Sequence, residues 1–439
     1  MKSLSKLVSL LFISALLLAA CGTTPQATSA PVVQTVTVKE TQIVEVPAEQ
    51  TEVRLSGWVS SPSETALLES LLYRFSVENP DILVKYEPIT GDYRQALLTA
   101  IASGTEPDVF YMDIFWWQEL AKNDTILALD DLMTSTSTAK EDFIPSLIDA
   151  FTFDGKVYGI PKDFNTLGMF YNQDLFDAAS LEYPTDDWTW DDLKAAATEL
   201  TDLSDPNKPV YGFCTPADPG RFPVFVFQNG GTPMNEDFSD STLDADPAIQ
   251  AAEFYSSFRA EEIGAIPSDL GEGWQGTLFG KGQCAMVYEG GWLIPYLRDS
   301  FPSTKYGVVL PPAGPGGEGN LIFTVAWGIS KNTENPDAAW RVVEFLTNET
   351  SQTTVLESGF ALPSRAALQD SEYFTNNPNA ATIFRGAGEG AHPFFWGAVG
   401  SDVNDQMQKA LERIFSEGQP VAESLQQAAE GIRTALQNQ

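Results

Sequence analysis

The sequence has little positive charge and almost no histidine. Its 439 residues include 25 Lys and Arg against 60 Asp and Glu, which gives a formal net charge of −35 at pH 7. Nucleic acids and anionic membrane surfaces are bound through clustered Lys and Arg, so this balance argues against both as partners. The single histidine, His392, excludes a His-rich metal site and the two-histidine helix of metalloproteases.

Signals for catalysis and for a cofactor are also missing. His392 lies next to Pro393 and three aromatic residues, and no serine has the surroundings of a nucleophile elbow. No Gly-rich phosphate-binding motif follows a predicted strand, so a nucleotide site has no support. We therefore expect no catalytic residues, no metal and no cofactor.

The first residues have the pattern of an export signal. Lys2 and Lys6 precede an apolar run over 7–20, which is too short to span a bilayer comfortably and suits a signal-peptide core. Small residues followed by Cys21 resemble the bacterial lipobox, in which the cysteine is lipidated and becomes the new N-terminus. Ordinary secretion is the alternative. We expect a signal peptide over 1–20 and an extracytoplasmic protein anchored to the cell membrane by a lipid on Cys21.

The next segment, 21–50, is predicted to be a flexible tether behind the lipidated cysteine. Residues 22–50 are rich in Thr, Pro, Ala, Val and Gln and contain no aromatic residue. An alternation of Val and Thr over 32–38 is the one hint of a strand. The only other cysteines, Cys214 and Cys284, permit one disulfide outside the cell or two buried thiols, and the sequence leaves both open.

The remaining chain alternates strand and helix patterns. Strands are predicted over 53–59, 82–86 and 107–111, separated by helices that begin after Ser61 and Asp92. This order implies a parallel sheet with right-handed crossovers, and hence an α/β fold. Later helices are predicted over 189–200, 246–262, 335–346, 402–415 and 421–436, and later strands over 285–288, 306–310 and 323–329.

Five of the ten tryptophans lie near predicted strand ends or in Gly-containing turns: Trp58, Trp116, Trp292, Trp327 and Trp396. Side chains at the carboxyl ends of parallel strands point into the crevice where such sheets bind ligands. An aromatic ring there can stack on the C–H face of a sugar ring. For any one of them, packing in the core is the alternative.

Carboxylate and amide side chains occur in similar positions, at Asp113, Asp163, Asn165 and Glu289. They can accept hydrogen bonds from ligand hydroxyl groups. Two of the carboxylates can also form an acid–base pair, so a glycoside hydrolase is an alternative. The acidic composition leaves a cation-binding protein, for example for polyamines, as a second alternative. For each single carboxylate, the simplest interpretation is a solvated side chain in a turn.

Short motifs along residues 52–437 add a further indication through their order. They lie at 75–80, 100–109, 154–161, 171–176, 189–193, 279–282, 290–292, 335–340 and 359–363. Together they resemble the extracellular solute-binding proteins (family 1) of ABC sugar importers, the group similar to maltose-binding protein. The loop over 218–222 departs from the aromatic-plus-carboxylate pattern of maltodextrin binders, which argues against a maltodextrin ligand.

The resemblance implies a two-lobed periplasmic-binding-protein-like fold. Each lobe is a mixed, mainly parallel sheet flanked by helices, and crossing strands form a hinge. Lobe one is expected over 51–170 plus 311–350, and lobe two over 171–310 plus 351–439. The implied function is capture of a neutral sugar or short oligosaccharide in the cleft, without bond cleavage, by a monomer that delivers it to a membrane-embedded ABC permease. The residues that the resemblance assigns to the ligand are Trp58, Ser61, Asp113, Trp116, Asp163, Asn165, Glu289, Trp292, Trp327 and Trp396.

Overall fold

The computed structural model describes residues 50–59, 61–388 and 390–438. The predicted signal peptide over 1–20, the lipidation site Cys21 and the predicted tether up to residue 49 lie outside these residues. Within them, none of the helices combines the length and the apolar character that crossing a membrane requires.

A nine-stranded mixed sheet organises the described chain, in the order β2-β1-β3-β10-β6-β8-β7, with β11 paired to β10 and β9 to β6. A separate pair is formed by β4 and β5. The strands are β1 (Thr51–Ser56), β2 (Ile82–Tyr86), β3 (Val109–Asp113), β4 (Thr152–Phe153), β5 (Lys156–Val157), β6 (Ile160–Asn172), β7 (Tyr211–Cys214), β8 (Cys284–Gly290), β9 (Tyr306–Val309), β10 (Asn320–Ile329) and β11 (Ala391–Pro393).

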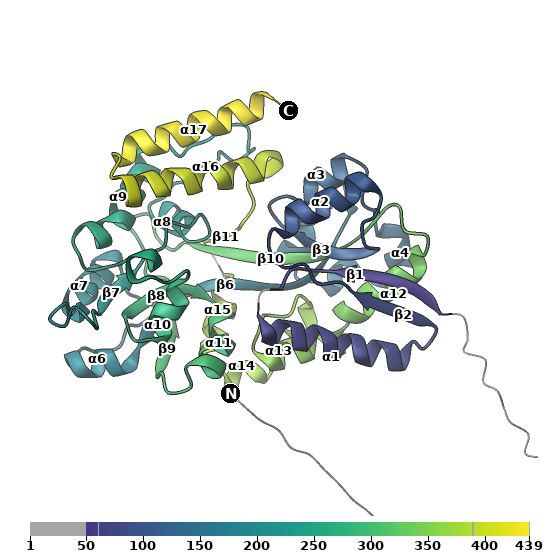
Figure 1. The fold of residues 1–439 in the computed structure, drawn as a ribbon, viewed down its shortest axis with the longest axis horizontal. Coiled ribbons are helices and arrows are strands. Elements are labelled where there is room, and N and C mark those ends of the chain that lie inside the picture. The colour runs from purple at the N-terminus through teal and green to yellow at the C-terminus, as the bar shows by residue number, and fades with distance from the viewer. Residues whose placement is uncertain (1–49, 60, 389, 439) are drawn as a thin grey trace, which may run out of the picture. The chain divides into compact units, whose positions relative to one another are not determined.

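The two longest strands, β6 and β10, run antiparallel to each other in the middle of the sheet (Figure 1). The strands β1, β2 and β3 are mutually parallel on one side, as the strand–helix–strand pattern predicts. On the other side β7 and β8 form a second parallel pair. The α/β class predicted from the sequence is therefore confirmed.

An irregularity in β6 has consequences for the side chains beside it. The partners of β10 pass from Asp163 directly to Pro161, so Lys162 is the extra residue of a β-bulge. Proline at this place has no N–H to donate, which weakens the regular ladder. In a regular strand neighbouring side chains point to opposite faces, whereas a bulge allows two neighbours to face the same space.

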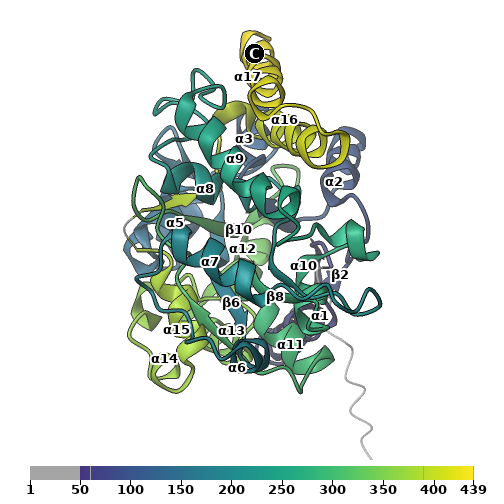
Figure 2. The same cartoon turned by 90° about the vertical axis from the view of Figure 1, so that its left-hand side faces the viewer.

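The helices begin largely where the sequence predicts them. Ser61 Oγ accepts the N–H of Glu64 at 3.1 Å, and Asp92 Oδ1 accepts that of Gln95 at 3.0 Å. The helices α16 and α17 lie side by side (Figure 2). The α-helices are α1 (Pro62–Glu78), α2 (Tyr93–Ser103), α3 (Trp117–Lys122), α4 (Asp130–Ser135), α5 (Pro145–Asp149), α6 (Gln173–Ala179), α7 (Trp190–Leu200), α8 (Phe222–Gln228), α9 (Asp246–Ala260), α10 (Gln275–Gly280), α11 (Leu293–Ser300), α12 (Pro336–Thr347), α13 (Glu349–Ser358), α14 (Tyr373–Asn376), α15 (Pro378–Arg385), α16 (Gly400–Glu412) and α17 (Val421–Gln437).

Cys214 and Cys284, whose state as a disulfide or as two thiols the sequence left open, form a disulfide bond. It joins Cys214 at the end of β7 to Cys284 at the start of β8, with their Cα atoms 6.0 Å apart. Both residues are buried. The bond therefore fastens two neighbouring parallel strands across a sequence separation of 70 residues.

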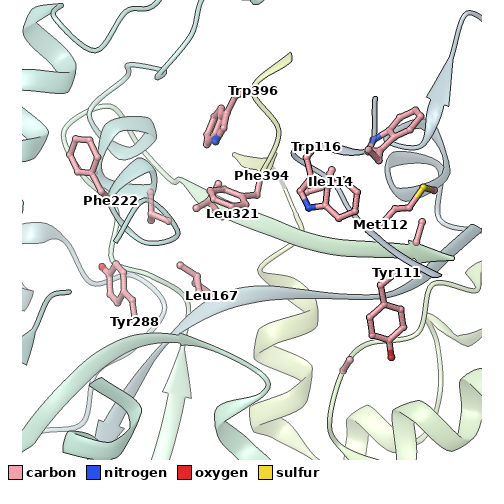
Figure 3. Packing of buried hydrophobic residues seen from close by; sticks show 14 of the residues in the cluster. Tyr111, Met112, Ile114, Trp116, Leu167, Phe222, Tyr288, Leu321, Phe394 and Trp396 are labelled. Carbon is pink, nitrogen blue, oxygen red and sulfur yellow. The ribbon is translucent and has the colours of Figure 1, made fainter. Parts of the chain in front are cut away.

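Apolar side chains pack on the sheet and bury its faces. Figure 3 shows part of this core, including Tyr111 from β3, Leu167 from β6 and Leu321 from β10. Phe394 and Trp396 follow β11 and belong to the same cluster. The core thus joins segments that are far apart in the sequence.

Candidate functional site

A cavity of about 240 Å³ lies where several strands of the sheet end. β1, β3 and β8 each lead into it at their carboxyl ends, while β6 and β10 pass beside it. Ligands of open α/β sheets bind at such places. The lining residues are Trp58, Glu64, Asp113, Ile114, Lys162, Asp163, Asn165, Trp292, Phe323, Thr324, Val325, Phe360 and Phe394.

Trp58 is the aromatic side chain that follows β1. Its ring packs edge-on against Tyr93, with centroids 5.3 Å apart, and against Tyr111, with centroids 4.9 Å apart. The preceding residue must be glycine, because a Cβ on Gly57 would come within 2.5 Å of the Tyr111 ring. The chain therefore passes close over Tyr111 and leaves Trp58 half-buried at the cavity.

Trp292 is the aromatic side chain that follows β8. Its indole Nε1 donates to Oε2 of Glu289 at 2.6 Å, and its ring meets Phe323 edge-on at 5.5 Å between centroids. The guanidinium carbon of Arg221 lies over the same ring, 5.5 Å from its centroid. Trp292 is thus held on several sides while it lines the cavity.

Glu289 lies behind Trp292 and is fully buried. Arg221 Nη2 donates to its Oε2 at 2.6 Å, and Trp274 Nε1 donates to its Oε1 at 2.6 Å. Burial raises the pKa of the Glu289 carboxyl, and the charge of Arg221 opposes that rise. The side chain of Gln275 donates to Oε1 as well.

Lys162 is the one cationic side chain among the residues that line the cavity. Its Nζ lies 3.3 Å from Oε1 of Glu64 and forms an ion pair with Asp163. The ammonium also lies over the rings of Tyr111 and Phe360, 5.0 and 5.6 Å from their centroids. Burial alone lowers the pKa of Lys162, but the two carboxylates outweigh it and hold that pKa above its usual value.

Asp113 and Asn165 add oxygen atoms with spare acceptor capacity. Among the described residues Asp113 forms no ion pair; its Oδ1 accepts the backbone N–H of Phe115 at 3.4 Å, and burial raises its pKa to about 7. Oδ1 of Asn165 is buried and has no hydrogen-bond partner in the described part of the chain. A Cβ on Gly291 would come within 2.5 Å of this oxygen, so only glycine fits beside it.

These features define what the cavity can bind. Two indole rings offer flat apolar surfaces, and the oxygens of Asp113, Asp163 and Asn165 offer acceptors for hydroxyl groups. Buried polar atoms without partners favour a ligand that supplies donors. A compact polyhydroxylated molecule with an apolar ring face has this combination.

The structure brings together five of the residues assigned to the ligand from the sequence, namely Trp58, Asp113, Asp163, Asn165 and Trp292. Their contacts with a ligand stay a prediction.

The other five residues of that prediction lie elsewhere. Ser61 caps α1, and Glu289 lies beneath Trp292. Trp327 is buried against Tyr111, with centroids 4.6 Å apart. Trp116 borders a separate cavity beside α3, and Trp396 borders another together with Phe227 and His392.

Sequence reasoning passed over several lining residues. Glu64 follows the predicted helix cap Ser61, and Lys162 precedes Asp163, but neither was assigned to the ligand. The bulge that turns both Lys162 and Asp163 toward the cavity has no signal in the sequence except Pro161. The remaining lining residues that sequence reasoning missed are Ile114, Phe323, Thr324, Val325, Phe360 and Phe394.

Comparisons with known proteins point to one family. The family model of bacterial extracellular solute-binding proteins matches residues 60–353. The chain is 28% identical over 343 residues to a putative binding protein of Brucella abortus, covering 76% of this chain and 82% of the relative. It is 26% identical over 330 residues to a maltotriose-binding protein of Pyrococcus abyssi, covering 72% of this chain and 67% of the relative.

Solved structures give the same result at the level of the fold. An ABC substrate-binding protein of Listeria monocytogenes in complex with cycloalternan aligns with a TM-score of 0.82 and 26% identity, over 88% of this chain and 99% of the other. Maltose-bound MalE3 of T. maritima aligns with a TM-score of 0.77 and 19% identity, over 88% of this chain and 100% of the other. The two-lobed fold expected from the sequence is thereby confirmed.

Proposed function

Because the chain belongs to the bacterial extracellular solute-binding proteins, we propose that it captures a neutral sugar or short oligosaccharide and delivers it to an ABC permease. The ligand is held in the cavity between Trp58 and Trp292 and leaves it unchanged. The observation that carries this proposal is the presence of two indole rings and several acceptor oxygens, including the unpartnered Oδ1 of Asn165, in one cavity.

The size of the cavity favours a small ligand. Its volume of about 240 Å³ is slightly below the range of roughly 300–1,000 Å³ for drug-sized ligands. One or two sugar rings suit such a space. Each stacked ring adds on the order of 1 kcal/mol beyond the area it buries. With two such rings and several hydrogen bonds to hydroxyl groups, we expect micromolar binding, about −8 kcal/mol.

The lobes and the attachment of the protein belong to the same proposal. Lobe one comprises 51–170 plus 311–350 and lobe two comprises 171–310 plus 351–439, so the chain passes from lobe one to lobe two within β6. A ligand that touches both lobes favours their closure. The signal peptide over 1–20 directs export, a lipid on Cys21 holds the protein at the outer face of the cell membrane, and the tether over 22–50 gives it reach.

A phosphorylated ligand has little support. Lys162 is paired with Glu64 and Asp163, and Arg221 is paired with Glu289 and with Asp218 at 2.9 Å. The positive charge of each cation is therefore already balanced by carboxylates and does not favour a phosphate. A neutral sugar needs no such cation.

The charge of the cavity favours a cationic ligand as a second candidate. Three carboxylates, Glu64, Asp113 and Asp163, line the cavity together with a single cation, Lys162. An amine can be held by Asp113 and by the faces of the indole rings. A glycoside hydrolase is a third candidate. Its one support is that two carboxylates, Asp113 and Asp163, line the same cavity.

One panel of ligands separates the three candidates. Thermal denaturation is followed with sugars, polyols, polyamines and amino acids, because a ligand that binds only the native state raises the melting temperature. We expect a sugar to give the largest shift and to be recovered intact by mass spectrometry. A shift with polyamines alone, or release of product from an aryl glycoside, would overturn the proposal.

A further inference from the structure

We propose that Glu289 is a positioning residue that sets the orientation of the Trp292 ring and does not itself contact the ligand. This inference rests on the proposed function for its binding readout, but its structural part can be tested without any ligand.

The hydrogen bonds of Glu289 leave no acceptor capacity for a sugar. A carboxylate offers about four acceptor positions on its two oxygens. Four donors occupy them: Trp274 and Gln275 on Oε1, and Arg221 and Trp292 on Oε2. Glu289 is also fully buried, so a ligand has no access to it.

The other contacts of Trp292 restrict the ring as well. Arg221 lies over the ring, and Phe323 meets it edge-on. A Cβ on Gly290 would come within 2.5 Å of the ring atoms, so the ring packs directly on the backbone of the preceding segment. The indole N–H bond to Glu289 then fixes the one remaining freedom, the rotation of the ring about its side-chain bonds.

This arrangement gives Glu289 an effect on binding through another residue. A ring held in place before binding loses no rotational freedom when a ligand stacks on it, which raises affinity. Arg221 is oriented by the same carboxylate and supports the ring from its own side. Removal of the Glu289 charge should therefore weaken binding only while Trp292 is present to be oriented.

A double-mutant cycle tests this inference. The variants are E289Q, W292F and the combination of the two, with W274F as a matched control. W274F removes an N–H donor from the same carboxylate, but Trp274 does not line the cavity. Calorimetric titration uses the sugar that gives the largest thermal shift, and the indole N–H signals of ¹⁵N-labelled protein without ligand are recorded, with the Trp292 signal assigned by its loss in W292F.

We expect E289Q to weaken sugar binding about tenfold, and to have less than a twofold effect when added to W292F. W274F should lower the melting temperature and leave the affinity within twofold. In the unliganded protein, E289Q should shift or broaden the Trp292 indole signal.

Equal weakening by E289Q in both backgrounds, or loss of affinity in W274F as large as in E289Q, would overturn the inference. An unchanged Trp292 signal in E289Q would overturn it even if no sugar binds, so that result is distinct from failure of the proposed function. If E289Q does not fold, the affinities of W292F and W274F are compared instead. The inference requires W292F to weaken sugar binding more than W274F does, and the opposite order would overturn it.

Discussion

The indole N–H of Trp292 donates to the carboxylate of Glu289 at 2.6 Å, and Glu289 is fully buried. A charged acceptor beneath a cavity-lining tryptophan connects the buried core to the predicted ligand-binding surface. Charge-assisted hydrogen bonds of this kind are stronger than neutral ones. We therefore expect ligand binding to depend on Trp292 more than on any other side chain.

Truncation of Trp292 gives the first prediction. Trp292→Ala removes a wall of the cavity, and we expect sugar affinity to fall at least tenfold while the protein stays folded. Trp188→Ala is the matched control, because Trp188 is also half-buried but does not line the cavity. Calorimetric titration and circular dichroism check both variants; equal affinity of Trp292→Ala and the wild type would contradict the assignment of the site.

The second prediction compares two asparagines of β6, Asn165 and Asn172. Both side chains are 6% exposed, but their hydrogen bonds differ. Oδ1 of Asn165 has no partner among the described residues, whereas Oδ1 of Asn172 accepts the N–H of Leu175 at the start of α6 at 3.2 Å. Asn165→Leu should weaken binding by about 1–3 kcal/mol without a loss of stability.

The control variant, Asn172→Leu, should show the opposite behaviour. Loss of the helix cap should cost about 1 kcal/mol of stability and leave the affinity unchanged. Chemical denaturation and calorimetric titration measure the two quantities separately. If Asn165→Leu destabilised the protein and bound sugar normally, the predicted acceptor role of Asn165 would be wrong.

The third prediction concerns the pH dependence of stability. Burial raises the pKa of Asp113 to about 7 from an ordinary value of 3.8. Between these values the unfolded chain ionises at this residue while the folded protein keeps the proton, so the free energy of unfolding falls as pH rises. The contribution is at most about 1.4 kcal/mol per pH unit.

Comparison of the wild type with Asp113→Asn isolates this contribution, because Glu64, Lys162 and Asp163 are present in both proteins. Urea denaturation between pH 4 and pH 7 should show a steeper fall for the wild type. Above pH 7 the difference between the two proteins should become constant. Parallel curves across the whole range would show that Asp113 titrates normally.

The disulfide gives the fourth prediction. Its ends are 70 residues apart, and closing a loop of this length stabilises a protein by about 4 kcal/mol in the chain-entropy model. The double variant Cys214→Ala, Cys284→Ala should therefore melt well below the wild type in the absence of reductant. Addition of a reductant should lower the melting temperature of the wild type toward that of the variant and leave the variant unaffected.

The predicted lipid anchor can be tested in cells. Cys21→Ser should move the protein from the membrane fraction to the soluble extracytoplasmic fraction, because a polypeptide without the lipid lacks the predicted anchor. Fractionation followed by immunoblotting measures the change. Retention of the variant at the membrane would show that another feature holds it there.

Local patterns in the sequence predicted the elements well. The cap residues Ser61 and Asp92 and the strand over 82–86 lie where the pattern places them, because caps and alternating hydrophobicity depend on nearby residues. The parallel order of the first strands also follows from local connections.

Features that depend on distant segments were not predictable in the same way. The pairing of β6 with β10 joins residues about 160 apart in the sequence, and the bulge at Lys162 arises only from that pairing. The assignment of Glu289 to the ligand came from its place after a strand, which does not tell a lining side chain from one beneath the surface. Trp327 was assigned because it lies near the end of the predicted strand over 323–329, and it is buried against Tyr111.

The most direct test is a crystal structure of the protein with the sugar that gives the largest thermal shift. We expect an intact sugar ring in the cavity, stacked on Trp292 or Trp58, with hydroxyl groups on the oxygens of Asp113, Asp163 or Asn165. A sugar bound at another place, such as the cavity beside Trp396, with no sugar between Trp58 and Trp292, would contradict it.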